Sequence, residues 1–273
     1  MEETARSDFP ELNKEVKIIW NSIAEWWNDK IGEGNDFQDI LIEPATERLL
    51  EIKPGDYILD IACGAGRFAR RMAAAGAEVL AIDQSEKFIE IARERTGQNY
   101  GKIRYRVCDA TDREALIALD KRKFDAAVCT MALMDMACIE PLISALPYLL
   151  KRKRHFVFSI LHPAFNSGKT RRFAEDYIEN GKVISNCGVM SMDYLKSFSY
   201  LGIGIRGQPV PQYYFHRPIG LLFNTFFRYG FKLDGIEEPA LPAELSEKAE
   251  TTVSWHCLNW IPPVLVARMR LID

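Results

Sequence analysis

Residues 57–68 read YILDIACGAGRF, and this stretch contains the strongest structural signal in the chain. Residues 57–61 form a short apolar run, which is typical of a strand buried on both faces of a parallel sheet. Gly64 and Gly66 then allow a sharp turn and a close approach of the backbone to a ligand. A helix is expected to begin at Arg67, so that its free N–H groups face the same turn. The stretch therefore predicts a strand, a ligand-binding loop and a helix in direct succession.

Strand-like and helix-like segments alternate beyond this loop. The expected strands are 78–82, 103–107, 124–130 and 156–160, and the expected helices are 67–75, 86–95, 112–119 and 139–150. Repeated strand–helix units imply a parallel sheet with right-handed crossovers and helices on both faces. The predicted fold class is therefore α/β with a doubly wound sheet. The basic run 151–155 is expected to be a solvated turn before the fifth strand.

The segments outside this alternation divide the chain into three predicted parts. A Trp-rich amphipathic helix over 11–30 precedes the core and a second helix follows at 44–51, whereas a stretch rich in Gly, Ser, Asn and Tyr interrupts it. Regular elements then resume with a helix over 218–229 and strands over 231–236 and 264–269. We predict an N-terminal helical lid (1–40), a ligand-binding domain (41–162 and 217–273) and an inserted cap (163–216).

Composition excludes several other classes of protein. The 273 residues are 48% hydrophobic and carry a net charge of -3, which argues against broad electrostatic binding to nucleic acid. No apolar run approaches the roughly 20 residues that span a membrane, and the acidic, polar N-terminus does not resemble a secretory signal. The 6 cysteines are scattered without metal spacing, so we predict reduced thiols and no metal site. We expect a cytoplasmic monomer or homodimer without a nucleic-acid or membrane partner.

Acidic residues follow three successive predicted strands, namely Asp60, Asp83 and Asp109. Ligands of such sheets bind at the carboxyl edge, where these strands end. Asp83 lies about 20 residues beyond the loop, where a carboxylate can accept hydrogen bonds from both hydroxyls of a ribose. Asp83 and Asp109 can alternatively cap the helices that follow them. Three acids along one edge favour a shared ligand site over separate caps.

Two cofactors are compatible with the loop. Residues 64–69 match G-x-G-x-x-G/A, which also occurs in NAD-binding proteins. Asp60 would disfavour a pyrophosphate but can accept contacts around an ammonium group, directly or through water. Asp109 can accept a hydrogen bond from the amino group of adenine. These two acids favour S-adenosylmethionine (SAM) over NAD, which we keep as the alternative.

With these motifs, the chain resembles the class I SAM-dependent methyltransferases that act on small molecules. The resemblance covers about residues 40–165 and extends more loosely to the final helix and two strands. It implies a Rossmann-like, mostly parallel seven-stranded sheet with an antiparallel last strand, and in-line methyl transfer to a small molecule. A non-catalytic SAM-binding subunit is the alternative outside enzymes. The residues that the resemblance assigns to the cofactor are Asp60, Ala62, Gly64, Gly66, Arg67, Asp83, Gln84, Asp109, Ala110 and Thr130.

The chain departs from the family pattern at two of the positions concerned. Ala62 stands where the family often has glycine, and we expect it to have a negative φ. Trp27 stands where a tyrosine is common, so that only a covering role carries over. Arg67 either pairs with the methionine carboxylate of SAM or is exposed to solvent.

Candidates for the acceptor side come mostly from the second half of the chain. His162 and His216 are candidate general bases for an acceptor that arrives protonated, or else hydrogen-bonded structural residues. Arg217 is a candidate partner for an acidic substrate or for a neighbouring carboxylate. Trp27 and Tyr214 are expected to line an aromatic acceptor pocket with the rest of the inserted cap. The same aromatic residues are equally compatible with a self-packed cap or a dimer contact.

Overall fold

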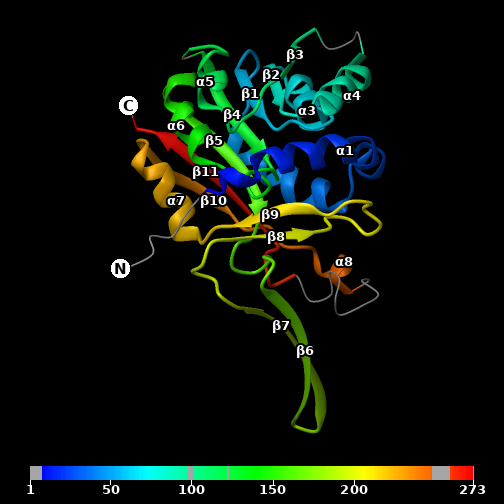
Figure 1. Ribbon diagram of the computed structural model, residues 1–273. Coiled ribbons are helices and arrows are strands. Elements are labelled where there is room, and N and C mark those ends of the chain that lie inside the picture. The colour runs from blue at the N-terminus through cyan, green and yellow to red at the C-terminus, as the bar shows by residue number, and fades with distance from the viewer. Residues whose placement is uncertain (1–7, 98–100, 122, 248–258, 273) are drawn as a thin grey trace.

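The computed structural model describes residues 8–97, 101–121, 123–247 and 259–272, and a seven-stranded sheet lies at its centre (Figure 1). The strands are β1 (Tyr57–Ile61), β2 (Glu78–Asp83), β3 (Ile103–Val107), β4 (Phe124–Thr130), β5 (Leu150–Leu161), β10 (Phe231–Glu237) and β11 (Val264–Leu271). Their order is β10-β11-β5-β4-β1-β2-β3. The pairs from β3 to β5 are parallel, whereas β11 is antiparallel to both β5 and β10. The predicted sheet with an antiparallel last strand is therefore confirmed.

Helices cover both faces of this sheet because the strands bury side chains on both faces. In β1, for example, Leu59 and Ile61 belong to one core cluster and Ile58 belongs to the other. The first cluster includes residues of α5, α6 and α7, and the second includes residues of η2, α2 and α3. The helices are η1 (Pro10–Leu12), α1 (Asn13–Ile31), η2 (Phe37–Ile42), α2 (Glu43–Leu50), α3 (Arg67–Ala74), α4 (Glu86–Thr96), α5 (Arg113–Ile117), α6 (Glu140–Leu149), α7 (Ile219–Arg228) and α8 (Ala243–Glu247).

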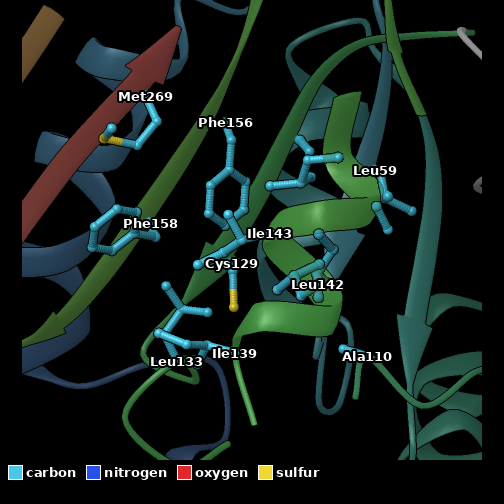
Figure 2. Packing of buried hydrophobic residues seen from close by; sticks show 14 of the residues in the cluster. Leu59, Ala110, Cys129, Leu133, Ile139, Leu142, Ile143, Phe156, Phe158 and Met269 are labelled. Carbon is cyan, nitrogen blue, oxygen red and sulfur yellow. The ribbon is translucent and has the colours of Figure 1, made fainter. Parts of the chain in front are cut away.

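Aromatic stacking fixes α7 against β5 in the first cluster. The rings of Phe158 and Phe226 are stacked with centroids 5.4 Å apart, and Phe156 stacks on Phe226 at 5.8 Å. Figure 2 shows Phe156 and Phe158 beside Ile143 of α6 and Met269 of β11. Burial of such side chains is the main driving force for folding, so this face holds the antiparallel end of the sheet in place.

The inserted segment consists of two hairpins. β6 (Thr170–Glu179) and β7 (Lys182–Ser191) form a long hairpin that projects from the body of the molecule (Figure 1). Its turn is Asn180-Gly181, with φ values of 51° and 75°, and this dipeptide is favoured where both turn residues need positive φ. β8 (Phe198–Gly202) pairs with β9 (Gln212–His216), and this second hairpin lies beside α1.

Three predictions need correction or restriction. The basic run 151–155 is part of β5, where the pairing with β4 shifts register, and Lys151 and Arg154 both pair with Asp125. Cys187 is disulfide-bonded, so the expectation of reduced thiols was wrong there. Residues 1–7 of the predicted lid and residues 248–258 and 273 of the predicted domain lie outside the described residues.

No helix within the described ranges is long and apolar enough to cross a bilayer.

Candidate functional site

A cavity of ≈ 1050 Å³ opens beside the carboxyl ends of β1, β2 and β4. One side is formed by the loop after β1 and by the residues that follow β2, β3 and β4. The opposite side is formed by α1 and by the β8–β9 hairpin with its connecting loop. Of the predicted cofactor residues, those that line the cavity are Ala62, Gly64, Arg67, Asp83, Gln84, Asp109, Ala110 and Thr130. The structure thus gathers residues from four strand ends around one space.

The loop after β1 presents its backbone to this cavity. Gly64 has φ +53°, and a Cβ at this position would meet no atom within 4 Å, so the loop leaves open space there. Gly66 has φ +73°, but a Cβ there would lie 2.3 Å from the Tyr105 hydroxyl. The amide of Cys63 donates to Ile82 O at 2.9 Å, which ties the loop to β2. Gly64 therefore leaves space for a ligand, whereas Gly66 leaves space for the Tyr105 side chain.

Asp83 at the end of β2 holds this loop. Its Oδ2 accepts from the amide of Gly64 at 2.9 Å and its Oδ1 accepts from the amide of Ser85 at 2.8 Å. The side chain is buried, and burial raises its pKa to about 6. A carboxylate has about four acceptor positions, so Asp83 retains capacity for ligand hydroxyls. The alternative role as a helix cap is wrong, because the Ser85 hydroxyl caps α4.

Asp109 after β3 has a similar arrangement. Its Oδ1 accepts from the amide of Thr111 at 2.8 Å and from the hydroxyl of the same residue at 2.7 Å. The cap of α5 is Asp112, whose Oδ1 accepts from the amide of Ala115 at 3.1 Å. Asp109 is therefore not the cap of that helix, and it lines the cavity instead.

Asp60 lies behind the loop and is fully buried. Neither of its carboxylate oxygens has a hydrogen-bond partner among the described residues. Burial, reinforced by the negative charge of Asp83, raises the pKa of Asp60 to about 8. A buried acid without a donor is costly unless a ligand or water supplies one. This orphaned acid, together with Asp83, Asp109 and the open space at Gly64, gives a set of acceptors that fits the ammonium, ribose and adenine groups of SAM.

Two predictions about this side of the cavity fail in detail. Ala62 has φ +55°, so the expected negative φ is wrong and the residue occupies the left-handed region that favours glycine. The Nε of Arg67 donates to Glu33 O at 2.6 Å, and its guanidinium also pairs with Asp39 and Glu43. With 16% of its side chain exposed, Arg67 is neither solvated nor available as an unpaired cation.

The structure does not bring His162 or His216 to the main cavity. His162 is buried, its Nε2 lies 2.8 Å from Glu238 Oε1, and its Nδ1 accepts from the amide of Ala164. The Nε2 of His216 lies 2.8 Å from Tyr194 O, and the ring lines a separate small cavity of ≈ 30 Å³. Burial lowers the pKa of both imidazoles. Proximity to the carboxyl edge suggested His162, and a place just before the late helix suggested His216. Both side chains are engaged in structural hydrogen bonds instead.

Arg217 also has a structural environment. It is 4% exposed and donates to the carbonyls of Leu133, Met136 and Ala137 at 3.2, 2.8 and 3.0 Å. Its guanidinium therefore stabilises the segment after β4 by hydrogen bonds. The structure gives no support for pairing of Arg217 with an acidic substrate.

Trp27 and Tyr214 do line the cavity, as expected. A Cβ at Gly204 would lie 2.8 Å from the Trp27 ring and 2.9 Å from the Tyr214 hydroxyl, so the two side chains converge there. Asp135 was not predicted from the sequence, although it is a buried acid that also lines the cavity. Its signal was an isolated acid in the apolar run after β4, at the same edge as the other acids. Within the described ranges, no cluster of three or more His, Cys, Asp or Glu side chains is arranged to hold a metal.

Comparison with known proteins adds independent information. Residues 58–153 match a methyltransferase domain family. The ubiquinone biosynthesis O-methyltransferase of Alkalilimnicola ehrlichii is 32% identical over 150 residues, which cover 54% of this chain and 59% of that protein. The demethylmenaquinone methyltransferase of Clavibacter sepedonicus is 30% identical over 139 residues, covering 50% of this chain and 53% of that protein. The chain thus spans less than two thirds of the length of these two curated relatives.

A solved structure extends the similarity over most of the chain. The SAM-dependent methyltransferase of Mesorhizobium loti superposes with a TM-score of 0.60 at 26% identity. The superposition covers 83% of this chain and 96% of that one. The shared fold therefore includes the regions on both sides of the matched domain.

Proposed function

We propose that this chain, whose residues 58–153 match a methyltransferase domain family, is a class I SAM-dependent enzyme that methylates a small molecule. One observation carries the proposal. A single cavity joins the residues of the cofactor motifs to an aromatic wall formed by α1 and the β8–β9 hairpin. An acceptor bound at that wall would therefore lie in the same space as the methyl donor.

The chain's own residues suit the binding of SAM. Asp83 would accept hydrogen bonds from the ribose hydroxyls, and Asp109 and Ala110 would hold the adenine. Asp60 and the backbone carbonyl of Thr130 would compensate the ammonium charge, while Gly64 leaves room for the methionine part. Bound SAM supplies an activated methyl group on a sulfonium sulfur. The protein's contribution is then to position the acceptor and exclude water.

We also propose how the parts of the chain share this work. Residues 1–40 act as a lid, residues 41–162 and 217–273 bind SAM, and residues 163–216 contribute the acceptor wall. Trp20 and Trp27 of α1 line the cavity, which supports the role of the lid. We propose that the enzyme acts in the cytoplasm as a monomer or homodimer, without nucleic acid or a membrane as partner.

Binding and turnover experiments test the proposal in turn. SAM and S-adenosylhomocysteine (SAH) should raise the melting temperature of the purified chain, whereas NAD should not. Stabilisation by NAD alone would instead favour an oxidoreductase. Extracts incubated with the enzyme and methyl-labelled SAM should then yield a labelled small molecule. Binding of SAH without any labelled product would favour a non-catalytic SAM-binding subunit.

A further inference from the structure

Beside the cofactor motifs, a second part of the cavity wall combines a buried acid with aromatic rings. Asp135 follows β4 and is 7% exposed, yet it lines the cavity. Tyr200 of β8 and Tyr214 of β9 line the same cavity, with their rings stacked 5.3 Å apart. Trp27 approaches from α1 and meets Tyr214 at Gly204. The acid and the three rings come from distant parts of the sequence and converge on one space.

A chain of side-chain amides orients the acid. The Nε2 of Gln212 donates to Asp135 Oδ1 at 3.3 Å. The Nε2 of Gln208 donates to Gln212 Oε1 at 3.2 Å, and its Oε1 accepts from the amide of Gly204 at 2.8 Å. Both glutamines are buried. Asp135 Oδ2 has no hydrogen-bond partner among the described residues, so one oxygen of the acid is available to a ligand.

Among the described residues, no cationic side chain compensates this acid. Burial raises the pKa of Asp135 well above its usual value, opposed only by the hydrogen bond from Gln212. Burial raises the pKa of Tyr200 and Tyr214, and the charge of Asp135 raises both further. Arg172 and Arg206 also line the cavity, but neither contributes to the pKa of Asp135. A buried carboxylate is stable as an anion only beside a cation or several donors. Asp135 has one side-chain donor, Gln212, so its ionised form requires a cation or further donors from a ligand.

We propose that this wall binds the methyl acceptor as a flat aromatic molecule bearing a protonated amine, with Asp135 as the partner of the ammonium group. This inference rests on the proposed methyltransferase function and narrows its acceptor. The carboxylate of Asp135 supplies the charge-assisted hydrogen bond, and the faces of Trp27, Tyr200 and Tyr214 favour a cation beside them. The same rings provide the apolar surface for the aromatic part of the acceptor.

Asp135 can also accept the proton that the amine must lose before it is methylated. An ammonium nitrogen has no lone pair until its proton moves to the Asp135 carboxylate, which then becomes a carboxylic acid. The freed lone pair forms the new N–C bond to the methyl group as the S–C bond breaks, and its electrons remain on sulfur. The positive charge passes from sulfur to the methylated nitrogen, which subsequently releases a proton to solvent.

A matched pair of probes tests the inference by binding, without turnover. Tryptamine and tryptophol share the indole ring and side-chain length but end in an amine and a hydroxyl, respectively. Calorimetric titration into the SAH-loaded protein should show tryptamine binding at least about tenfold more tightly, as expected for one charge-assisted hydrogen bond. Asp135→Asn should reduce this preference to less than about threefold. Asp36→Asn, which changes another acid lining the cavity, should retain it.

Each result has a defined consequence. Equal binding of both probes, tighter binding of tryptophol, or no binding of either would overturn the amine acceptor and leave the SAM site untouched. A preference that survives in Asp135→Asn would overturn the role of Asp135. If that variant does not fold, the wild-type protein still tests the role of Asp135. Tryptamine binding should then release protons and tryptophol binding should not, because the ammonium group stabilises the ionised form of this buried acid. Failure of SAH itself to bind would instead refute the proposed function, and the inference with it.

Discussion

At the scale of single residues, the two glycines of the cofactor loop have different tasks. A Cβ at Gly64 would point into open space, whereas a Cβ at Gly66 would collide with Tyr105. We expect Gly64→Val to abolish SAM binding in a folded protein, because the side chain occupies the ligand's space. Gly66→Ala should mainly lower stability, by about 1–3 kcal/mol. Calorimetric titration and urea denaturation of both variants check this. Normal SAM binding by Gly64→Val would show that the loop is not the cofactor site.

Ala62 stores backbone strain beside those glycines. At φ +55° an alanine is disfavoured by about 1–2 kcal/mol, whereas glycine is not. Glycine also loses more conformational entropy on folding, which offsets part of this gain. We expect Ala62→Gly to raise the free energy of unfolding by about 0.5–1 kcal/mol. The matched change Ala65→Gly, at a residue without positive φ, should lower it. Equal effects of the two changes in urea denaturation would contradict the role of strain.

Asp83 and Asp109 should differ in their importance for SAM. Asp83→Ala removes the acceptor for two ribose hydroxyls, each charge-assisted hydrogen bond being worth about 1.5–3 kcal/mol. We therefore expect SAM affinity to fall at least about tenfold, with some loss of stability because Gly64 and Ser85 lose their acceptor. Asp109→Ala should lose roughly threefold to thirtyfold, since adenine retains its apolar contacts. Calorimetric titration measures both, and unchanged affinity in Asp83→Ala would refute the ribose assignment.

At the scale of elements, α1 joins the sheet domain to the acceptor wall. It buries Val16, Ile19 and Ile23, and it packs against α4 and β9. An acceptor must enter before water is excluded, so we expect α1 to open more readily than the central strands. Hydrogen exchange should show weaker amide protection in α1 than in β1 and β4 without ligand. Protection of α1 should increase with SAH. Equal protection of α1 and the strands in both states would show that α1 does not open and only packs against the domain.

Elements whose signals are local were predictable from the sequence. The sheet from β1 to β5 followed from apolar runs, loop glycines and helical spacing, which operate over a few residues. The β6–β7 hairpin was missed although its turn, Asn180-Gly181, carries a strong hairpin signal, because the side chains of β6 are mostly exposed. The run 151–155 was placed in a turn because its charges masked a strand that continues through a change of register.

The candidate site was predictable only where the backbone dictates position. The acids after β1, β2 and β3 share an edge because the strands are parallel, so their order in the sequence was enough to group them. Side-chain direction does not follow from such order, which is why His162 and His216 were wrongly placed in the active site. Asp135 was missed because its orientation depends on a hydrogen bond from Gln212, which lies 77 positions away. Contacts of this kind exist only in the folded chain.

At the scale of the whole molecule, buried histidines and buried acids make the free energy of unfolding depend on pH in opposite directions. Burial lowers the pKa of His155, His162 and His216 below the ordinary value, so the folded state binds fewer protons and loses stability as pH falls through about 6.5. Burial raises the pKa of Asp83 to about 6 and helps raise that of Asp60 to about 8. These acids keep protons in the folded state, so stability is lost as pH rises above about 4 and through those values.

We therefore expect the ligand-free protein to be most stable at roughly pH 6–7 and to lose up to about 1.4 kcal/mol per pH unit and group on the alkaline side, until pH exceeds the folded pKa. Asp60→Asn should remove one contribution between about pH 4 and 8, so that the alkaline limb becomes shallower and the acidic limb steeper, whereas Asp36→Asn should alter neither. The alkaline slope that remains comes in part from Asp135, whose pKa burial also raises. Saturating SAH should also reduce the alkaline loss, because its ammonium group would stabilise ionised Asp60. Urea denaturation between pH 5 and 9 measures all of these curves. An alkaline limb that Asp60→Asn leaves as steep as before would show that Asp60 is ionised at neutral pH in the ligand-free protein. An alkaline loss that saturating SAH leaves unchanged would remove Asp60 as the partner of the SAM ammonium group.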